Sequence, residues 1–215
     1  MKSNTEFIIN RFYDDNPKLK PLTSELNELA RTLTERIQNG AKVLLCGNGG
    51  SAADSDHIVG ELMKGFDKLR PLPEDFKEKY RTMYGDSGYD VAQKLQQGIP
   101  AISLNQHNAL NSATLNDIDP NLIFAQQIMG LGNQGDILIG ISTSGQAENV
   151  AQAIKAANVK GLHTIGLTGK TGGQLVTLSD MCIVVPANET YRVQEFHLAI
   201  YHFLCLYIES EMFDA

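Results

Sequence analysis

Apolar residues along the chain form five short continuous runs, and longer segments with apolar residues at helical spacing separate them. Each run is four to six residues long and is bounded by glycine, proline or polar residues, which is typical of a strand buried on both faces. The five predicted strands are 42–47, 101–104, 136–141, 163–167 and 181–185. Strands that alternate with helices predict an α/β fold, with a parallel sheet covered by helices on both sides.

Helical spacing predicts a long helical segment at the start of the chain. We expect helix over residues 5–38, broken into two pieces near Pro17 and Pro21 and stopped at Asn39-Gly40. Residues 1–39 would then form an N-terminal helical segment of one domain that spans 1–215. Apolar positions at this spacing include Leu26, Leu29, Leu33 and Ile37. Further helices are predicted over about 51–65 and 121–130, in a segment ending near 158, and over about 191–212.

Residues 66–99 interrupt this alternation and are interpreted as an insertion. The segment is polar and rich in charge, and it carries prolines, glycines and five aromatic residues. A structureless loop of this length is uncommon inside a domain, so we expect some helix in it. Ordering the aromatic residues requires a surface to pack on. We therefore expect the insertion to fold over the functional site or onto a neighbouring subunit; the alternative is that its aromatics pack only among themselves.

Composition narrows the class of protein. Of 215 residues, 42% are hydrophobic and 20% are charged, as in an ordinary globular protein. The net charge of -7 and the absence of a basic cluster argue against nucleic acid as a partner. No apolar run is long enough to cross a membrane. Three cysteines without metal-binding spacing and a start without an apolar signal region predict a cytoplasmic protein.

Two loops that follow predicted strands have the chemistry of an anion site. The first is Gly47-Asn48-Gly49-Gly50-Ser51 and the second is Ser142-Thr143-Ser144-Gly145-Gln146. Glycines let the backbone approach an anion, free N–H groups at a helix start point at it, and hydroxyls add donors. The alternative is simple N-capping of two helices. Two such loops in one sheet favour ligand binding, and the first lacks the pattern of a dinucleotide-binding loop.

Acid–base groups lie on the helices next to these loops. His57 and Glu61 are four residues apart, so both project from one face of the helix that begins at the first loop. The last helix carries His197 and His202, which lie about 140° apart around its axis, so both cannot face the same site. The spacing does not decide which of these two histidines belongs to it.

These motifs, in this order, resemble those of the phosphoheptose isomerases. The resemblance covers about residues 25–212, with 66–99 longer than usual. The matching stretches are Cys46-Gly-Asn-Gly-Gly-Ser51, Asp54, His57, Glu61, Gly140-Ile-Ser-Thr-Ser-Gly145, Asn149, Leu167-Thr-Gly-Lys170, Gly172-Gly173, Arg192-Val-Gln-Glu195 and His202.

The resemblance implies a fold, an activity and a set of site residues. It implies an SIS fold with a five-stranded parallel sheet, a homotetramer with active sites between subunits, and a phosphorylated sugar as substrate. Glu61 would be the catalytic base and His202 the partner acid/base, in an enediol interconversion of sedoheptulose 7-phosphate and D-glycero-D-manno-heptose 7-phosphate. Zinc, present in some members, would be bound by His57, Glu61, Gln194 and His202. The residues implied to hold the substrate are Asn48, Gly49, Ser51, Asp117, Ser142, Thr143, Ser144 and Gln194.

The sequence departs from the family pattern around the substrate. Ala147 stands where a phosphate-contacting serine is usual, Gly65 replaces a usual arginine, and Tyr191 replaces an aspartate of some members. Lys64, Lys68 or Arg70 would then supply the missing basic group. Two alternatives remain: an isomerase of another sugar phosphate, and a non-catalytic SIS protein that binds a sugar phosphate or a protein. The presence of His57, Glu61 and His202 together argues against the second alternative.

Overall fold

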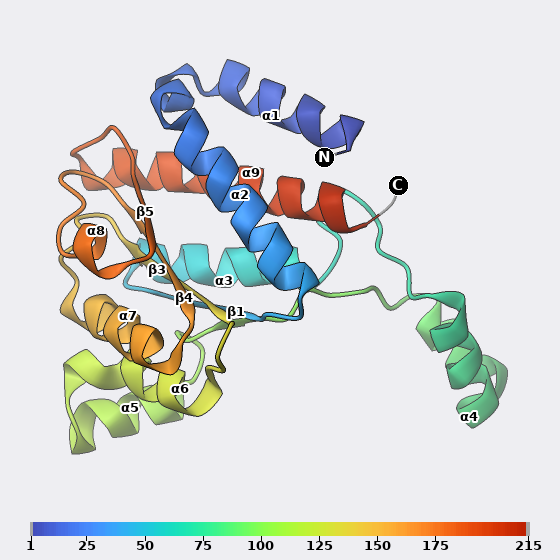
Figure 1. Ribbon diagram of the computed structural model, residues 1–215. Helices are drawn as coiled ribbons and strands as arrows, with labels where there is room; N and C mark the ends of the chain where they lie inside the picture. The colour runs from blue at the N-terminus through green and yellow to red at the C-terminus, as the bar shows by residue number, and fades with distance from the viewer. Residues whose placement is uncertain (1, 214–215) are drawn as a thin grey trace.

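A five-stranded parallel sheet forms the centre of the computed structural model, which describes residues 2–213 (Figure 1). Its order is β2-β1-β3-β4-β5, and every neighbouring pair is parallel. The strands are β1 (Val43–Gly47), β2 (Ala101–Ser103), β3 (Ile137–Ser142), β4 (His163–Thr168) and β5 (Met181–Val184). The predicted α/β class and the five predicted strands are confirmed.

Helices cover both faces of the sheet, and each face has its own apolar core. One face carries α2 (Thr23–Gln38), α3 (Gly50–Leu62) and α9 (Thr190–Met212), with α1 (Ser3–Asp15) packed on the outside of α9. The other face carries α6 (Ile123–Leu131), α7 (Glu148–Lys160) and the short α8 (Leu175–Leu178). The helix α5 (Asn108–Asp117) packs against α6.

The N-terminal helical segment breaks where the prolines predict. A 3-10 helix, η1 (Pro17–Leu22), separates α1 from α2. The apolar face of α2 packs into the core, where Leu26, Leu29, Leu33 and Ile37 are buried. Aromatic stacking holds α1 against α9, since the ring centroids of Phe12 and Phe203 lie 4.3 Å apart.

The strand order creates a switch point between β1 and β3. From β1 the chain continues through α3 to β2 on one side, and it later returns to β3 on the other side of β1. The helices that follow these two strands, α3 and α7, therefore lie on opposite faces of the sheet. Ligands in open parallel sheets bind in the crevice at such a point, outside the carboxyl ends of the strands.

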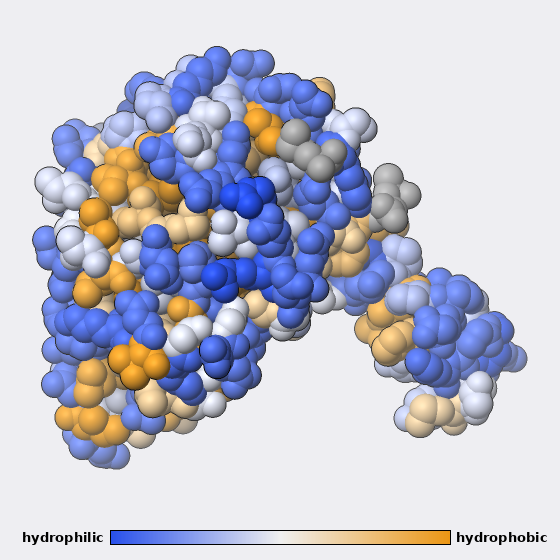
Figure 2. All heavy atoms as spheres, viewed as in Figure 1, coloured by the Kyte–Doolittle hydropathy of each residue, from blue (hydrophilic) through white to orange (hydrophobic). Residues whose placement is uncertain are grey.

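The predicted insertion forms an arm, residues 71–97, that projects from the body (Figures 1 and 2). It contains α4 (Glu74–Ala92), which is kinked at Gly85, and the antiparallel bridge between Pro71 and Gln96 closes its base. Residues 71–97 do not fold over the site of their own chain (Figure 1), whereas Phe66, at the start of the predicted insertion, packs against the ring of His202; packing of the arm on a neighbouring subunit stays a prediction. Its aromatics contact residues of the arm itself: Tyr80 packs on Tyr84, and Arg81 stacks over Tyr89.

Candidate active site

The two anion loops lie side by side at the switch point. The first (47–51) connects β1 to α3, and the second (142–146) leads from β3 towards α7. Asn48 and Asn149 join the two sides through a pair of amide hydrogen bonds of 2.8 and 2.9 Å. Gly49 has φ 56° and ψ -120°, a conformation that only glycine adopts readily, so the first loop depends on a glycine there.

The hydroxyls of these loops are not used as N-caps of the helices that follow. The N-cap residues of α3 and α7 are Gly49 and Ala147, which have no hydroxyl and make no side-chain cap. Within the loops, Ser51 and Ser142 are buried and Thr143 is half-buried. Among the second loop's hydroxyls, that of Ser144 accepts a local hydrogen bond, from the backbone N–H of Gln146 at 3.3 Å. The loops therefore fit an anion site better than simple capping.

Glu61 lies between two imidazoles. Its Oε1 atom is 2.9 Å from His57 Nε2 and 3.2 Å from His202 Nε2. The Glu61 side chain is 6% exposed, whereas those of His57 and His202 are 49% and 35% exposed. The spacing of four residues on α3 places His57 beside Glu61, and α9 crosses the same face to bring in His202. A buried carboxylate with two partly accessible imidazoles can exchange protons with a ligand.

The structure decides between the two histidines of α9. His197 is fully buried, and burial lowers its pKa to about 4, so it is a neutral core residue. His202 faces Glu61 from the opposite part of the helix surface.

Tyr201 and Asp54 extend the site behind His57. The Tyr201 hydroxyl lies 2.9 Å from His57 Nδ1 and 3.4 Å from Asp54 Oδ1. Burial raises the pKa of Tyr201, so its hydroxyl stays protonated and remains a hydrogen-bond donor. Burial also raises the pKa of Asp54. The sequence did not single out Tyr201, and its position next to His202 was the one available signal.

Three of the predicted metal ligands come together. Ligand atoms of His57, Glu61 and His202 all lie within 4.8 Å of one another. Both carboxylate oxygens of Glu61 are buried, and among residues 2–213 neither the two imidazole contacts of Oε1 nor any contact of Oε2 has hydrogen-bond geometry, so a cation there would satisfy them. Imidazole nitrogens and carboxylates are zinc ligands, and Tyr201 on the second nitrogen of His57 resembles an outer partner of a metal site. These residues fit a zinc ion.

Two predicted residues lie apart from this cluster. The amide of Gln194 lies over Gly50, so close that a Cβ on Gly50 would be 2.0 Å from its nitrogen. Gln194 thus sits at the first turn of α3, beside the first anion loop. Asp117 is exposed at the end of α5, where it accepts a hydrogen bond from Asn116.

Known proteins share this architecture and sequence. The family model described as SIS domain matches residues 18–77 and 82–169, and the gap between the two parts falls inside α4. The phosphoheptose isomerase of a Nitratiruptor species is 42% identical over 176 residues, which are 82% of this chain and 80% of that protein. That of Thermodesulfovibrio yellowstonii is 35% identical over 211 residues, 96% and 92% of the two chains.

A solved structure supports the same family. The phosphoheptose isomerase from Neisseria gonorrhoeae superposes with a TM-score of 0.73 at 30% identity, covering 94% of this chain and 93% of that one. Fold and family model together define this chain as an SIS-domain protein. Given the identity and coverage of these relatives, it belongs to the phosphoheptose isomerase family.

Proposed function

We propose that this protein is a phosphoheptose isomerase, which converts sedoheptulose 7-phosphate into D-glycero-D-manno-heptose 7-phosphate. The observation that carries the proposal is the buried Glu61 carboxylate, which lies within 3.2 Å of two imidazole nitrogens near the end of the helix that begins at the first anion loop. The relatives named above are phosphoheptose isomerases, and their similarity extends over most of the chain.

The two anion loops would bind the phosphate. Their backbone N–H groups and the hydroxyls of Ser51, Ser142, Thr143 and Ser144 are the donors for its oxygens. Because the protein carries a net charge of -7, these local donors must outweigh a repulsive overall field.

Glu61 and His202 would move the protons. Glu61 takes a proton from C1 of the open-chain ketose and returns it to C2, so the carboxylate ends as it began. His202 transfers the proton between O1 and O2: the O1 hydroxyl loses a proton as the C1 aldehyde forms, and the O2 carbonyl oxygen gains one. The two groups lie 3.2 Å apart, which allows both to act on neighbouring carbon and oxygen atoms of one substrate.

Zinc would be held by His57, Glu61 and His202, whereas Gln194, the fourth predicted ligand, lies apart from them beside the first anion loop. Bound there, it would act as a Lewis acid on the substrate oxygens. Tyr201 and Asp54 keep His57 oriented in either case, because the Tyr201 hydroxyl bridges them.

The assembly and the location of the protein belong to the same proposal. We expect a homotetramer with active sites between subunits, in which the arm would contact a neighbouring chain and Asp117 would contact the substrate. Among residues 2–213, no helix is both long and apolar enough to span a membrane. We expect a cytoplasmic enzyme.

Turnover in D2O tests the chemistry directly. Incubation with sedoheptulose 7-phosphate should give the aldose with deuterium at C2, seen by NMR, because the proton on Glu61 exchanges with solvent. A product without deuterium would argue against an enediol with solvent exchange. The altered substrate contacts at Gly65 and Ala147 favour one second candidate, an isomerase of another ketose phosphate. Turnover of a different ketose phosphate alone would establish it.

A further inference from the structure

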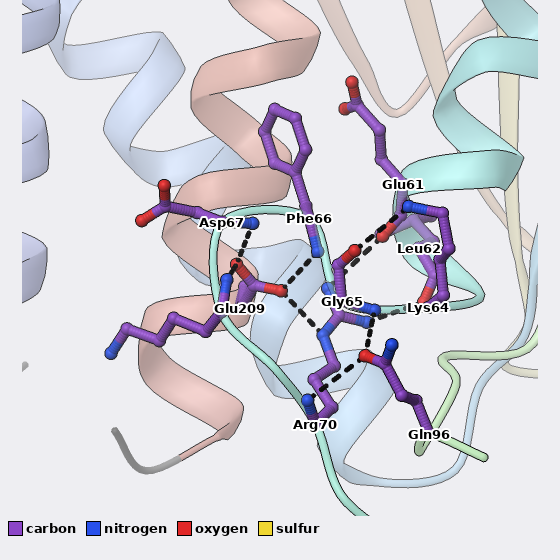
Figure 3. Close-up of polar contacts among 10 residues, drawn as sticks. Glu61, Leu62, Lys64, Gly65, Phe66, Asp67, Arg70, Gln96 and Glu209 are labelled. Atoms are coloured by element: carbon purple, nitrogen blue, oxygen red, sulfur yellow. Dashed lines mark hydrogen bonds and ion pairs between the residues drawn. The ribbon is translucent and has the colours of Figure 1, made fainter. Parts of the chain in front are cut away.

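A buried carboxylate on α9 holds the loop that follows α3 (Figure 3). Four donors converge on Glu209: the backbone N–H groups of Phe66 (2.9 Å), Asp67 (2.9 Å) and Lys68 (3.1 Å), and Nε of Arg70 (2.7 Å). Glu209 and Arg70 are each 1% exposed. We call this pair and its contacts the clamp. The expectation that Arg70 supplies a basic group to the substrate is therefore wrong.

The remaining nitrogens of Arg70 reach the end of α3. Nη1 donates to the backbone oxygen of Leu62 at 2.8 Å, and Nη2 donates to that of Glu61 at 3.3 Å. The last carbonyls of a helix lack partners within the helix, and a positive charge at that end is favourable. Arg70 thus acts as a C-terminal cap that holds the residue whose side chain is the proposed base.

The clamp also reaches His202. The loop that it fixes places the ring of Phe66 5.6 Å from that of His202, between centroids, at an angle of 33°. Gln96 secures the same loop by accepting hydrogen bonds from the backbone N–H groups of Gly65 (3.0 Å) and Arg70 (3.2 Å). Glu209 and His202 both lie on α9. The clamp therefore contacts both proposed proton-transfer residues: Glu61 through Arg70, and His202 through Phe66.

We propose that Arg70 and Glu209 are positioning residues, which set the placement of Glu61 relative to His202 during proton transfer. This inference rests on the isomerase function proposed above. Buried ion pairs are weak evidence for stability, because apolar pairs of similar size are often as stable. A misplacement of about 1 Å at a reacting group can cost about 100-fold in rate. The clamp therefore acts mainly on kcat, since the anion loops that bind the phosphate lie at the other end of α3.

A double-mutant cycle separates positioning from stability. The variants are Arg70→Met, Glu209→Gln and the double variant, compared with wild type by kcat, KM and thermal unfolding. Each single variant leaves a buried group without its partner and should unfold at lower temperature. The double variant removes the unpaired charge and should recover much of the stability. We expect its kcat to stay about 10- to 100-fold below wild type, with KM changed by less than about twofold.

A merely structural clamp gives a different result. In that case kcat returns to within about twofold of wild type in the double variant as its stability returns, and the proposal is overturned. Arg81→Met is the matched control, because Arg81 pairs with Glu78 on the exposed surface of the arm. Its kcat should equal that of wild type.

A second readout does not depend on activity. The chain has five histidines, so labelling their Cε1 carbons with 13C gives few NMR signals, each assigned by substitution. Release of Phe66 in Arg70→Met should shift the His202 signal through the change in ring current and leave that of His163 in place. If the wild-type protein turns over no sugar phosphate, the proposed function fails. The His202 NMR signal still tests whether the clamp positions His202. An unmoved His202 signal would refute the positioning role.

Discussion

Replacing Glu61 by glutamine isolates the proton-accepting charge of the site. The two side chains have nearly the same shape, so the substitution changes charge and leaves packing intact. Glu61 is 6% exposed, and glutamine keeps an oxygen that can face the two imidazole nitrogens, so the buried site loses a charge and keeps its shape; a neutral amide is no harder to bury than a carboxylate. We therefore expect the thermal unfolding temperature to stay the same or rise.

The loss of activity should be large. A general base typically contributes about 10²- to 10⁴-fold, which corresponds to about 2.7 to 5.4 kcal/mol in the activation free energy. Substrate affinity should change little, because the anion loops lie at the opposite end of α3 from Glu61.

The assay is initial-rate turnover of sedoheptulose 7-phosphate, followed by the aldose product, together with calorimetric binding of the same sugar. Glu35→Gln is the control, since Glu35 pairs with Arg31 on the exposed face of α2. A Glu61→Gln enzyme with kcat within about threefold of wild type would show that Glu61 is not the base. Loss of sugar binding together with activity would show a structural defect instead.

Four further results are expected. Ser51→Ala and Ser144→Ala should each weaken sugar-phosphate binding by about 1–3 kcal/mol, and unchanged calorimetric affinity in both would leave the loops as plain helix starts. Zinc measured by elemental analysis should be lost in His57→Ala; stoichiometric metal in that variant would disprove the ligand set. Replacing residues 74–92 by a short Gly/Ser linker should lower the mass of the assembly in light scattering, and an unchanged tetramer would show that the arm is dispensable for it. The unfolding free energy should fall by about 3 kcal/mol as pH drops from 6.5 to 4, since the buried His197 has its pKa lowered from 6.5 to about 4 and the unfolded chain binds the proton first; an equally steep fall in His197→Gln would contradict this.

The sequence predicted the sheet because each strand is a short apolar run between breakers. It failed at α5, whose residues Asn108–Asp117 are mostly polar, with only Thr114 buried. Apolar residues recur at helical spacing only where one face of a helix is buried, and α5 has almost no buried face. The anion loops were predictable for a related reason, since glycines and hydroxyls directly after a strand mark one edge of a parallel sheet.

The clamp was not predictable from sequence. Arg70 lies in a stretch with many charged residues, where a solvated side chain is the ordinary expectation. Its partner Glu209 is 139 positions further along the chain, on a helix with its own apolar repeat. Only the packing of α9 against α3 brings the two charges together. Tyr201 was missed for the same reason, because its contacts to His57 and Asp54 span 144 and 147 positions.

Gly65 belongs to the loop that the clamp holds, and that loop requires a glycine there. A Cβ at position 65 would lie 2.2 Å from the backbone oxygen of Lys68 and 2.5 Å from Oε1 of Gln96. The loop conformation that brings Arg70 onto Glu209 therefore excludes every side chain at position 65, including the arginine usual in the family. An arginine placed at position 65 by itself would break the loop. Because Arg70 is enclosed, the candidates for the replacement cation are Lys64 and Lys68, both of which keep access to solvent.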